Sequence, residues 1–353
     1  MSAPPMHRKG WIVSATAALA LGSAACSTGN AKSAATGATT TSTSALSAVA
    51  AGGAAALQDA YESVLTRVRP TVVEISTSQG LGSGIVYDDK GDIVTNAHVV
   101  GTSTKFSVSL VDGRTLDGTL VGAYPTDDLA VIKVPTSGLA AARFADSAQV
   151  KVGEITLAIG NPLGLDSSVT DGIVSATGRT VSEGGGVVLP STIQTSAAIN
   201  PGNSGGALVD LNGDVIGIPT LAAVDQQLGG GAAAGIGFAI PSNTVKRIAD
   251  QLIATGKVSD SGRAALGISG ATASTLAGQP IGVLIRAAQS GQAAAAAGIK
   301  AGDIVTAVNA KPTPTLDDLQ TVLADLAPGQ TATVDVTHPD AKTQSYKVTL
   351  GSL

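Results

Sequence analysis

The sequence predicts an all-β domain, built as antiparallel barrels or a sandwich, followed by a smaller α+β domain. Many short β-type runs separated by turn signals fill residues 71–240, which is the spacing of barrels and sandwiches. An amphipathic helical pattern closes this region, and strands mixed with two helical patterns follow Arg263. A chain of 353 residues is also too long for one ordinary domain, so the length agrees with two.

Composition excludes several classes of protein. The net charge is −5 and no cluster of Lys and Arg occurs, so the chain lacks the basic surface that nucleic-acid binding needs. Cys26 is the single cysteine and there are three histidines, which rules out an intramolecular disulfide and argues against a zinc site of paired thiolates or several histidines. We therefore expect no nucleic-acid partner, no metal and no cofactor.

The amino terminus reads as an export signal over residues 1–25. His7, Arg8 and Lys9 precede an uncharged run, Trp11 to Ala25, that is short for a membrane-spanning helix. Cys26 follows Ala24 and Ala25, and this segment resembles the lipobox of bacterial lipoproteins, in which the thiol is acylated. Ser23 departs from the aliphatic residue usual there, which leaves ordinary signal cleavage open. We expect an exported protein of the cell envelope, anchored to the membrane through a lipid on Cys26 or otherwise secreted.

Residues 26–53 consist almost entirely of Ser, Thr, Ala and Gly, which predicts a flexible tether. A short amphipathic helix is expected after it, with apolar side chains at helical spacing up to Pro70. Those apolar residues are Leu57, Tyr61, Val64, Leu65 and Val68.

The first domain is expected to span residues 54–256. The β-type runs in it are Thr71–Ile75, Ser83–Tyr87, Asp92–Asn96, Lys105–Leu110, Leu129–Val134, Glu154–Ile159, Ser168–Thr177, Val187–Thr195, Ala207–Val209 and Val215–Pro219. A closing helix carries apolar residues from Val245 to Ile253, with Ser242 or Asn243 as the N-cap and Gly256 as the stop. Residues 257–262 are then a boundary, and residues 263–353 form the second domain.

A serine lies in a glycine-rich turn, Asn200-Pro201-Gly202-Asn203-Ser204-Gly205-Gly206, where Pro201 and Gly202 suit the central positions of a type II turn. Such a turn exposes a hydroxyl and directs backbone N–H groups toward one point. A nucleophile and donors for an oxyanion are the two requirements of acyl transfer. The turn alone is moderate support, because most glycine-serine turns are only turns.

His98 is the only histidine of the barrel region and follows the strand-like Ile93–Ala97, at a strand end where catalytic side chains are often presented. Taken alone, a lone histidine is more often a hydrogen-bonded core residue. The turn around Ser204 also satisfies the G-x-S-x-G elbow of α/β-hydrolases, but that elbow opens a helix and precedes its histidine. Here a strand follows, and His98 lies before Ser204, which is the chain order of chymotrypsin-like proteases.

A carboxylate should complete the set. Asp127 and Asp128 precede the strand-like Leu129–Val134, and period two places Asp127 on the face of Lys133. Asp128 shares the opposite, more apolar face, so we expect Asp128 to be buried and to orient the imidazole, and Asp127 to be a solvated turn residue.

Three segments now resemble one family, the HtrA (DegP-type) serine proteases with a C-terminal PDZ domain. These segments are Thr95–Val100, Thr126–Val134 and Ile199–Gly206. The resemblance implies a chymotrypsin-like double β-barrel followed by an α+β PDZ domain. It implies His98, Asp128 and Ser204 as the catalytic triad, and the N–H groups of Gly202 and Ser204 as the oxyanion hole. Ser196 stands where an aspartate is common in the family, so how the loop before Ser204 is held is open.

The same resemblance implies the specificity pocket and the substrates. The pocket for the residue on the acyl side of the scissile bond would be lined by Ala198, Ile199 and Ile236, which carry no acid. We expect cleavage after Val, Ile, Ala or Leu, and poor cleavage after Lys or Arg. Unfolded or damaged proteins are the implied substrates, and a homotrimer formed through the region of Leu57–Val68 is the implied assembly.

In the second domain, Ala265–Ile268 resembles the carboxylate-binding loop of PDZ domains. Leu266, Gly267 and Ile268 would hold a peptide C-terminus that pairs along a strand starting at Ile268, beside a helix from Leu316 to Leu326. Without the resemblance, this run equally predicts an ordinary strand start.

Two other functions remain open. One is a latent protease that acts mainly as a chaperone or scaffold, for which the glycine-rich Gly229–Gly235 would suit a mobile loop. The other is a serine esterase, which the chain order disfavours.

Overall fold

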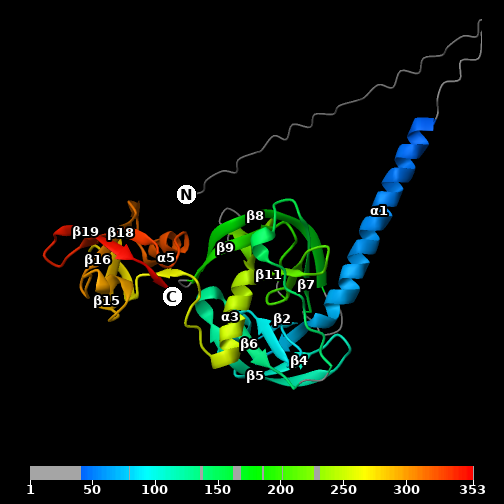
Figure 1. Cartoon of the computed structure of the whole chain (residues 1–353), viewed down its shortest axis with the longest axis horizontal. Helices are drawn as coiled ribbons and strands as arrows, with labels where there is room; N and C mark the ends of the chain where they lie inside the picture. The colour runs from blue at the N-terminus through cyan, green and yellow to red at the C-terminus, as the bar shows by residue number, and fades with distance from the viewer. Residues whose placement is uncertain are drawn as a thin grey trace, which may run out of the picture. The chain divides into compact units, whose positions relative to one another are not determined.

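The computed structural model describes residues 41–78, 80–135, 138–161, 168–184, 187–200, 202–225 and 231–352. The expected export signal and Cys26 lie outside these residues. Two antiparallel barrels and a smaller mixed domain make up the described chain from Val72 onward (Figure 1).

The first barrel is closed, with strand order β1-β2-β3-β6-β5-β4. Its strands are β1 (Val72–Ser76), β2 (Leu81–Val86), β3 (Asp92–Thr95), β4 (Lys105–Ser109), β5 (Thr115–Tyr124) and β6 (Leu129–Lys133). The second barrel is also closed, in the order β10-β11-β12-β9-β8-β7. Its strands are β7 (Ile155–Gly160), β8 (Ser168–Gly184), β9 (Val187–Thr195), β10 (Ala207–Val209), β11 (Val215–Asp225) and β12 (Gly231–Pro241). Closure confirms the barrels and excludes the sandwich.

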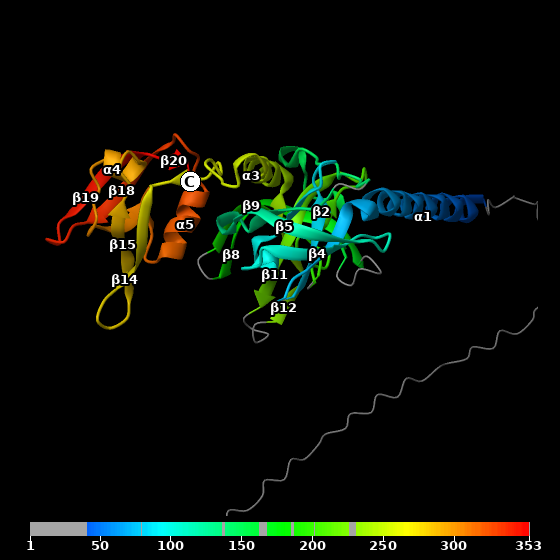
Figure 2. The ribbon, with the colours of Figure 1, turned by 90° about the horizontal axis from the view of Figure 1, so that it is seen from below.

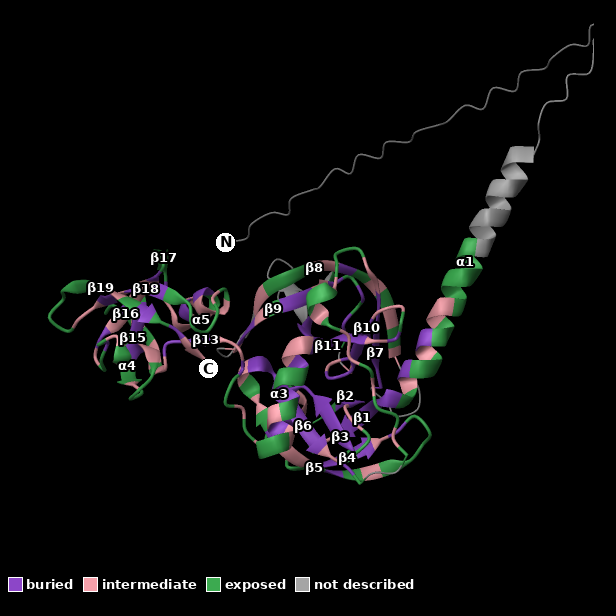
Figure 3. Cartoon of the chain, in the orientation of Figure 1, coloured by how far each residue is buried: buried purple, intermediate pink, exposed green. Residues whose placement is uncertain are grey.

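Strand β6 has an uninterrupted apolar sequence up to Lys133 because both of its faces are buried. Ala130 and Ile132 point into the core of the first barrel, whereas Leu129 and Val131 join a second cluster that also contains residues of the second barrel. Both faces of the strand are therefore buried, so alternation of polar and apolar residues disappears. The strands drawn as buried in Figure 3 include β6 and its neighbour β3.

Helix α3 (Ser242–Thr255) covers the shared cluster with Val245, Ile248 and Leu252. It ends at Gly256, whose φ of 70° is left-handed, as predicted. The expected N-cap is wrong: Pro241 is the N-cap, and Ser242 is the first helical residue, whose hydroxyl donates to the carbonyl of Ala145.

Two expectations about the glycine- and alanine-rich segments need correction, and a further strand is absent from the prediction. Helix α1 runs over Thr41–Val68, so residues 41–53 are helical where composition predicts a tether, which agrees with the high helix propensity of alanine. Strand β12 begins at Gly231, so residues 231–235 belong to a strand and not to a loop, while residues 229–230 lie outside the described chain. Strand β5, with its polar residues and Gly118, is not among the predicted runs.

The C-terminal domain contains a sheet in the order β14-β15-β16-β18-β19, with β17 paired to β16. Its strands are β14 (Ile268–Ser274), β15 (Pro280–Ala288), β16 (Ile304–Val308), β17 (Lys311–Pro312), β18 (Thr331–Thr337) and β19 (Thr343–Thr349). A separate pair joins β13 (Ala264–Ala265) to β20 (Gly351–Ser352), and the helices are α4 (Ala293–Ala296) and α5 (Leu316–Ala324). Strand β14 is an edge strand and packs near α5 (Figure 2).

Helix α5 begins with a capping box, in which the Thr315 hydroxyl accepts from the N–H of Asp318 and the Asp318 carboxylate accepts from the N–H of Thr315. Its apolar face, including Leu319 and Val322, packs into a core with Val305 and Val334. The predicted α+β domain is thus present, with its own core.

Candidate active site

The first barrel brings His98 and Asp128 together. Strand β3 pairs with β6, with Thr95 opposite Ala130, so the segments that follow β3 and precede β6 meet at the same end of the barrel. His98 lies in the short helix α2 (Ala97–Val100), and Asp128 joins the 3₁₀ turn η2 (Pro125–Asp127) to β6. Asp128 has a left-handed φ of 48° and is 3% exposed, so the expected buried carboxylate is present.

The Asp128 carboxylate is held at both oxygens. Its Oδ2 lies 2.8 Å from Nδ1 of His98, and its Oδ1 accepts the backbone N–H of His98 at 2.9 Å. The Asp128 carbonyl accepts from the N–H of Ala97 and from the side-chain amide of Asn96. A carboxylate next to Nδ1 places the proton of neutral histidine there, which leaves Nε2 as an acceptor.

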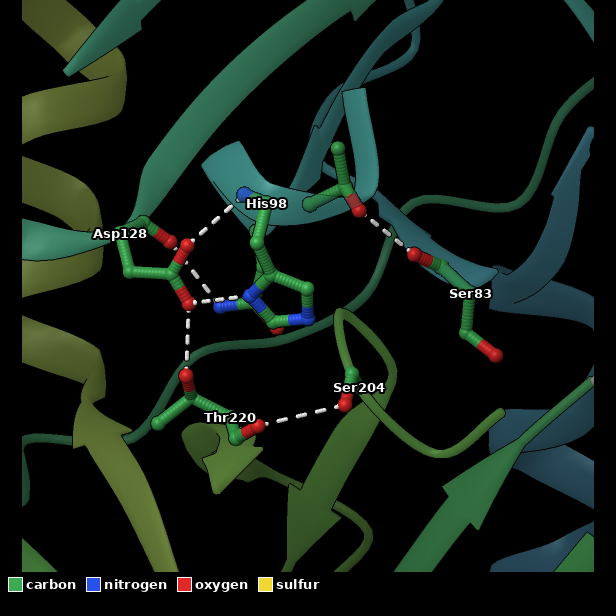
Figure 4. Close-up of polar contacts among 7 residues, drawn as sticks. Ser83, His98, Asp128, Ser204 and Thr220 are labelled. Carbon is green, nitrogen blue, oxygen red and sulfur yellow. Dashed lines mark hydrogen bonds and ion pairs between the residues drawn. The ribbon is translucent and has the colours of Figure 1, made fainter. Parts of the chain in front are cut away.

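Ser204 lies in a turn closed by a hydrogen bond of 3.0 Å from the N–H of Asn203 to the carbonyl of Asn200. Gly202 has φ 107°, the positive value that the third position of a type II turn requires. The Ser204 hydroxyl donates to the carbonyl of Thr220 at 3.2 Å. In Figure 4, Ser204 and Asp128 lie on opposite sides of the His98 ring.

Thr220 belongs to the site and was not predicted from the sequence. It lies on β11 and is 5% exposed, and its hydroxyl donates to Oδ2 of Asp128 at 2.6 Å. Its carbonyl accepts from the Ser204 hydroxyl, so Thr220 connects the two residues (Figure 4). No sequence signal separates this threonine from the others, because its partner Asp128 is 92 positions away.

Asp127 is buried, so the expectation of a solvated turn residue is wrong. The carboxylate is 2% exposed and lies 2.8 Å from the guanidinium of Arg263, which also donates to the carbonyl of Thr126. Period two fails because Asp127 belongs to η2 and not to the strand. Burial raises the pKa of Asp127, and the nearby positive charge of Arg263 opposes that rise.

Two glycines after Ser204 permit close approach of the chain. A Cβ on Gly205, whose φ is 81°, would lie 2.2 Å from the carbonyl oxygen of Ser83. A Cβ on Gly206 would lie 2.3 Å from the carbonyl oxygen of Ile159. The glycine-rich sequence therefore follows from packing of the turn against both barrels.

Ser196 holds the start of the loop before Ser204. Its N–H donates to the carbonyl of Ile173 at 3.1 Å, and its hydroxyl accepts the N–H of Ile173 at 3.0 Å. Farther along, the carbonyl of Ala198 accepts from the Thr170 hydroxyl and from the Asn203 amide. Hydrogen bonds from β8 thus hold this loop, although the loop carries Ser196 at the position where an aspartate is common in the HtrA proteases.

The residues expected to form the specificity pocket differ in exposure. Ile199 is 7% exposed and packs in the core of the second barrel, next to Gly237. Ile236 is 38% exposed, and Ala198 is exposed as well. Their role in specificity stays a prediction.

In the C-terminal domain, Leu266 is buried, Gly267 has a left-handed φ of 67°, and β14 begins at Ile268, where the strand was expected. A cavity of ≈ 360 Å³ is lined by these three residues and by Leu316, Leu319 and Leu323 of α5, among others. The loop, the edge strand and the helix thus surround a partly apolar hollow.

Among the described residues, no group of three or more His, Cys, Asp or Glu side chains is arranged to hold a metal ion. No helix of the described chain is long and apolar enough to span a membrane.

The fold and the site together define a trypsin-like peptidase domain followed by a PDZ domain. Residues 82–218 match the family model of the trypsin-like peptidase domain, and residues 259–350 match that of the PDZ domain. A solved structure of the serine endoprotease from Yersinia pestis is similar with a TM-score of 0.56 and 34% identity, covering 83% of this chain and 98% of that one. The HtrA-type protease AlgW, solved with a decapeptide, is similar with a TM-score of 0.57 and 30% identity, and the match covers 83% of this chain and 98% of that one. The chain belongs to the HtrA family.

Curated relatives agree with this assignment. The chain is 41% identical over 314 residues to serine protease PepD of Mycobacterium tuberculosis, and the match covers 82% of this chain and 66% of that protein. It is 45% identical over 240 residues to periplasmic serine endoprotease DegP of Escherichia coli, and the match covers 66% of this chain and 49% of that protein. The chain thus spans 66% of the length of PepD and 49% of the length of DegP.

Proposed function

We propose that the protein is a serine endopeptidase that cleaves peptide bonds through an acyl-enzyme. The observation that carries this proposal is the contact between His98 Nδ1 and the buried Asp128 carboxylate, with Thr220 linking Asp128 to Ser204. The membership of the chain in the HtrA family supports the same function.

In the proposed mechanism, Nε2 of His98 takes the proton of Ser204 as the hydroxyl attacks the peptide carbonyl. Asp128 stabilises the imidazolium that forms, because its carboxylate lies 2.8 Å from Nδ1. The N–H groups of Gly202 and Ser204 are proposed to donate to the oxyanion. His98 then gives the proton to the leaving amine, and water repeats the sequence to release the acyl group.

Unfolded or damaged proteins are the proposed substrates, with Val, Ile, Ala or Leu on the acyl side of the cleaved bond. The apolar residues Ala198, Ile199 and Ile236 support this preference because none of them would pair with Lys or Arg. A cleavage profile measured on a peptide library tests it, and a profile dominated by Lys and Arg would contradict it.

The PDZ domain is proposed to bind peptide C-termini. Strand β14 is an edge strand, so its free side can add a peptide as a further strand, and the loop at Leu266–Ile268 lies at the end of that strand. The HtrA-type protease AlgW has been solved with a decapeptide and with a tripeptide, which supports peptide binding. Deletion of residues 264–353, which keeps Arg263 beside the buried Asp127, is expected to abolish binding of apolar C-terminal peptides and to slow cleavage of unfolded substrates.

Export to the cell envelope is the proposed location, with a lipid on Cys26 as the anchor. The relatives from Escherichia coli and Brucella are named periplasmic, which supports export. Mass spectrometry of the protein from membranes of a producing bacterium would detect the acyl chains on Cys26. A homotrimer formed near Leu57–Val68 is a further part of the proposal, and light scattering of the purified chain tests it.

Digestion of reduced, unfolded casein by the purified chain tests the peptidase function, with Ser204→Ala beside it, at two temperatures. We expect cleavage by the wild type and none by Ser204→Ala. Equal inactivity of both proteins would favour a latent protease that acts as a chaperone or scaffold. Hydrolysis of activated esters without any cleavage of casein would favour an esterase.

A further inference from the structure

Ser83 is a fully buried serine of β2 whose polar groups all bond to other segments. Its hydroxyl donates to the carbonyl of Gly202 at 2.5 Å and accepts the N–H of Asn161 at 2.8 Å. Its N–H donates to the carbonyl of Ser204 at 3.0 Å, and its carbonyl accepts the Thr95 hydroxyl at 2.6 Å. Ser83 thus joins the first barrel to the turn that carries Ser204.

The two carbonyls that Ser83 binds belong to Gly202 and Ser204, whose N–H groups are the proposed oxyanion donors. The Gly202 carbonyl shares its planar peptide unit with the N–H of Asn203, and the Ser204 carbonyl shares its unit with the N–H of Gly205. The two bonds therefore fix the peptide units next to the proposed donors and restrict ψ of Gly202 and of Ser204. Gly202 has no side chain that would select one backbone conformation, and its φ is 107°. The hydrogen bond from Ser83 to the Gly202 carbonyl therefore restrains the backbone conformation of Gly202, which no side chain of its own restrains.

Among the described residues, the other backbone hydrogen bonds of this turn do not reach the first barrel directly, and the N–H of Gly205 donates to the carbonyl of Pro219 on β11 of the second barrel. The N–H of Asn203 donates to the carbonyl of Asn200, and the N–H of Gly206 donates to the carbonyl of Asn203. These two bonds lie inside the turn, and the bonds to Pro219 and Thr220 attach the turn to β11, so Ser83 makes the direct hydrogen bonds between the turn and the first barrel.

Ser83 fixes the position of the turn relative to His98, because β2, which carries Ser83, pairs with β3, the strand that leads to His98. Ile85 of β2 lies opposite Val94 of β3, and the Thr95 hydroxyl bonds directly to Ser83. The barrel that carries His98 and Asp128 is therefore fixed to the turn that carries Ser204 through this serine. In the view of Figure 4, Ser83 lies on the side of Ser204 away from Asp128.

We propose that Ser83 is a positioning residue that holds the N–H groups of Gly202 and Ser204 in register with His98, through hydrogen bonds to the carbonyls of Gly202 and Ser204. This inference rests on the proposed peptidase function. Ser83→Ala removes the bond to the Gly202 carbonyl and leaves the N–H of Asn161 without that acceptor. Because removal of one oxyanion donor costs about 10²- to 10³-fold in kcat, misplacement of the turn should cost about 10- to 100-fold, with KM nearly unchanged.

The test uses the full chain and compares wild type, Ser83→Ala, Ser83→Cys and the control Thr156→Val. Thr156 is also fully buried, and its hydroxyl contacts the Thr195 hydroxyl, so the control removes a buried hydroxyl away from Gly202. The readouts are kcat, KM, thermal unfolding and the affinities of two inhibitors. A peptide aldehyde ending in valine forms a hemiacetal oxyanion, whereas the matching peptide alcohol reports binding of the ground state.

We expect Ser83→Ala to weaken aldehyde binding by the factor by which kcat falls, with alcohol binding unchanged. Thr156→Val should keep wild-type kcat and aldehyde affinity even if it lowers the unfolding temperature. Ser83→Cys retains a weak donor and should fall between wild type and Ser83→Ala, and it decides the matter if Ser83→Ala does not fold. Wild-type kcat and aldehyde affinity in the folded Ser83 variants would overturn the positioning role. Inactivity of the wild type to the level of Ser204→Ala would instead overturn the peptidase function.

Discussion

Thr220 donates its hydroxyl to the same oxygen of Asp128, Oδ2, that faces Nδ1 of His98. One buried threonine therefore sets the orientation of the carboxylate that sets the orientation of the histidine. The relationship links β11 of the second barrel to the Asp128 segment of the first.

Thr220→Val should lower kcat by about 10- to 100-fold, because a hydrogen bond to a charged group contributes about 1.5–3 kcal/mol. KM should change little. Steady-state cleavage of a peptide substrate measures both quantities. Thr192→Val is the matched control, since the Thr192 hydroxyl is buried and donates only to the carbonyl of Arg179 among described residues. Equal losses of kcat in the two variants would contradict the role of Thr220.

Gly205→Ala should abolish cleavage and destabilise the protein more than Gly153→Ala. Both glycines have positive φ, which costs a substituted L-residue about 1–2 kcal/mol. Of these two positions, only at Gly205 would the added Cβ also collide with the Ser83 carbonyl, because no atom of the described residues lies within 4 Å of a Cβ on Gly153. Urea denaturation compares the two variants, and equal losses of stability would refute the steric argument.

Arg263→Ala should lower the free energy of unfolding by about 3–5 kcal/mol, the range for removing one partner of a buried ion pair. The Asp127 carboxylate, which is 2% exposed, would lose its positive partner. Asp127→Asn in the Arg263→Ala background should recover part of the loss, because no buried charge then remains. Urea denaturation at neutral pH provides the measurement, and strictly additive losses would contradict the coupling.

His338 makes the stability of the PDZ domain depend on pH. Its Nδ1 lies 2.7 Å from Oδ1 of Asp303, and hydrogen bonding to that carboxylate raises the pKa of His338 above its ordinary value. Stability from a raised histidine pKa is complete below the unfolded value of about 6.5 and is lost as the pH rises through the folded value.

The unfolding temperature of wild type should therefore exceed that of His338→Gln at pH 5.5, and the gap should narrow by pH 8.5. Differential scanning calorimetry of the full chain at four pH values measures the gap. A gap that does not change with pH would show that protonation of His338 does not stabilise the fold.

Much of the barrel domain could be predicted from the sequence because its strands carry local signals. Apolar runs such as Leu129–Val134 and turn residues such as Gly256 act over short distances, so they can be read from the sequence. Strand β12 could not be predicted because Gly and Ala have low strand propensity, and its neighbours β11 and β9 stabilise it through pairing. The start of α1 cannot be predicted from composition, because a segment rich in Ala, Ser, Thr and Gly is also typical of a flexible tether.

The site was only partly predictable for a related reason. His98 and Asp128 stand out through scarcity and strand position, whereas Thr220 and Ser83 are common residue types in ordinary strands. Their importance depends on partners that lie 92 and 119 positions away in the chain. The prediction for Asp127 is wrong because the strand period does not extend into the 3₁₀ turn, and because the partner of Asp127, Arg263, lies 136 positions away.

The most direct measurement of the central claim is the site of reaction with a peptidyl phosphonate, located by mass spectrometry of the digested protein. The proposed mechanism predicts one adduct, on Ser204, and its loss in both Ser204→Ala and His98→Ala. An adduct on another residue, or undiminished labelling of Ser204 in His98→Ala, would contradict the proposal that His98 activates this serine.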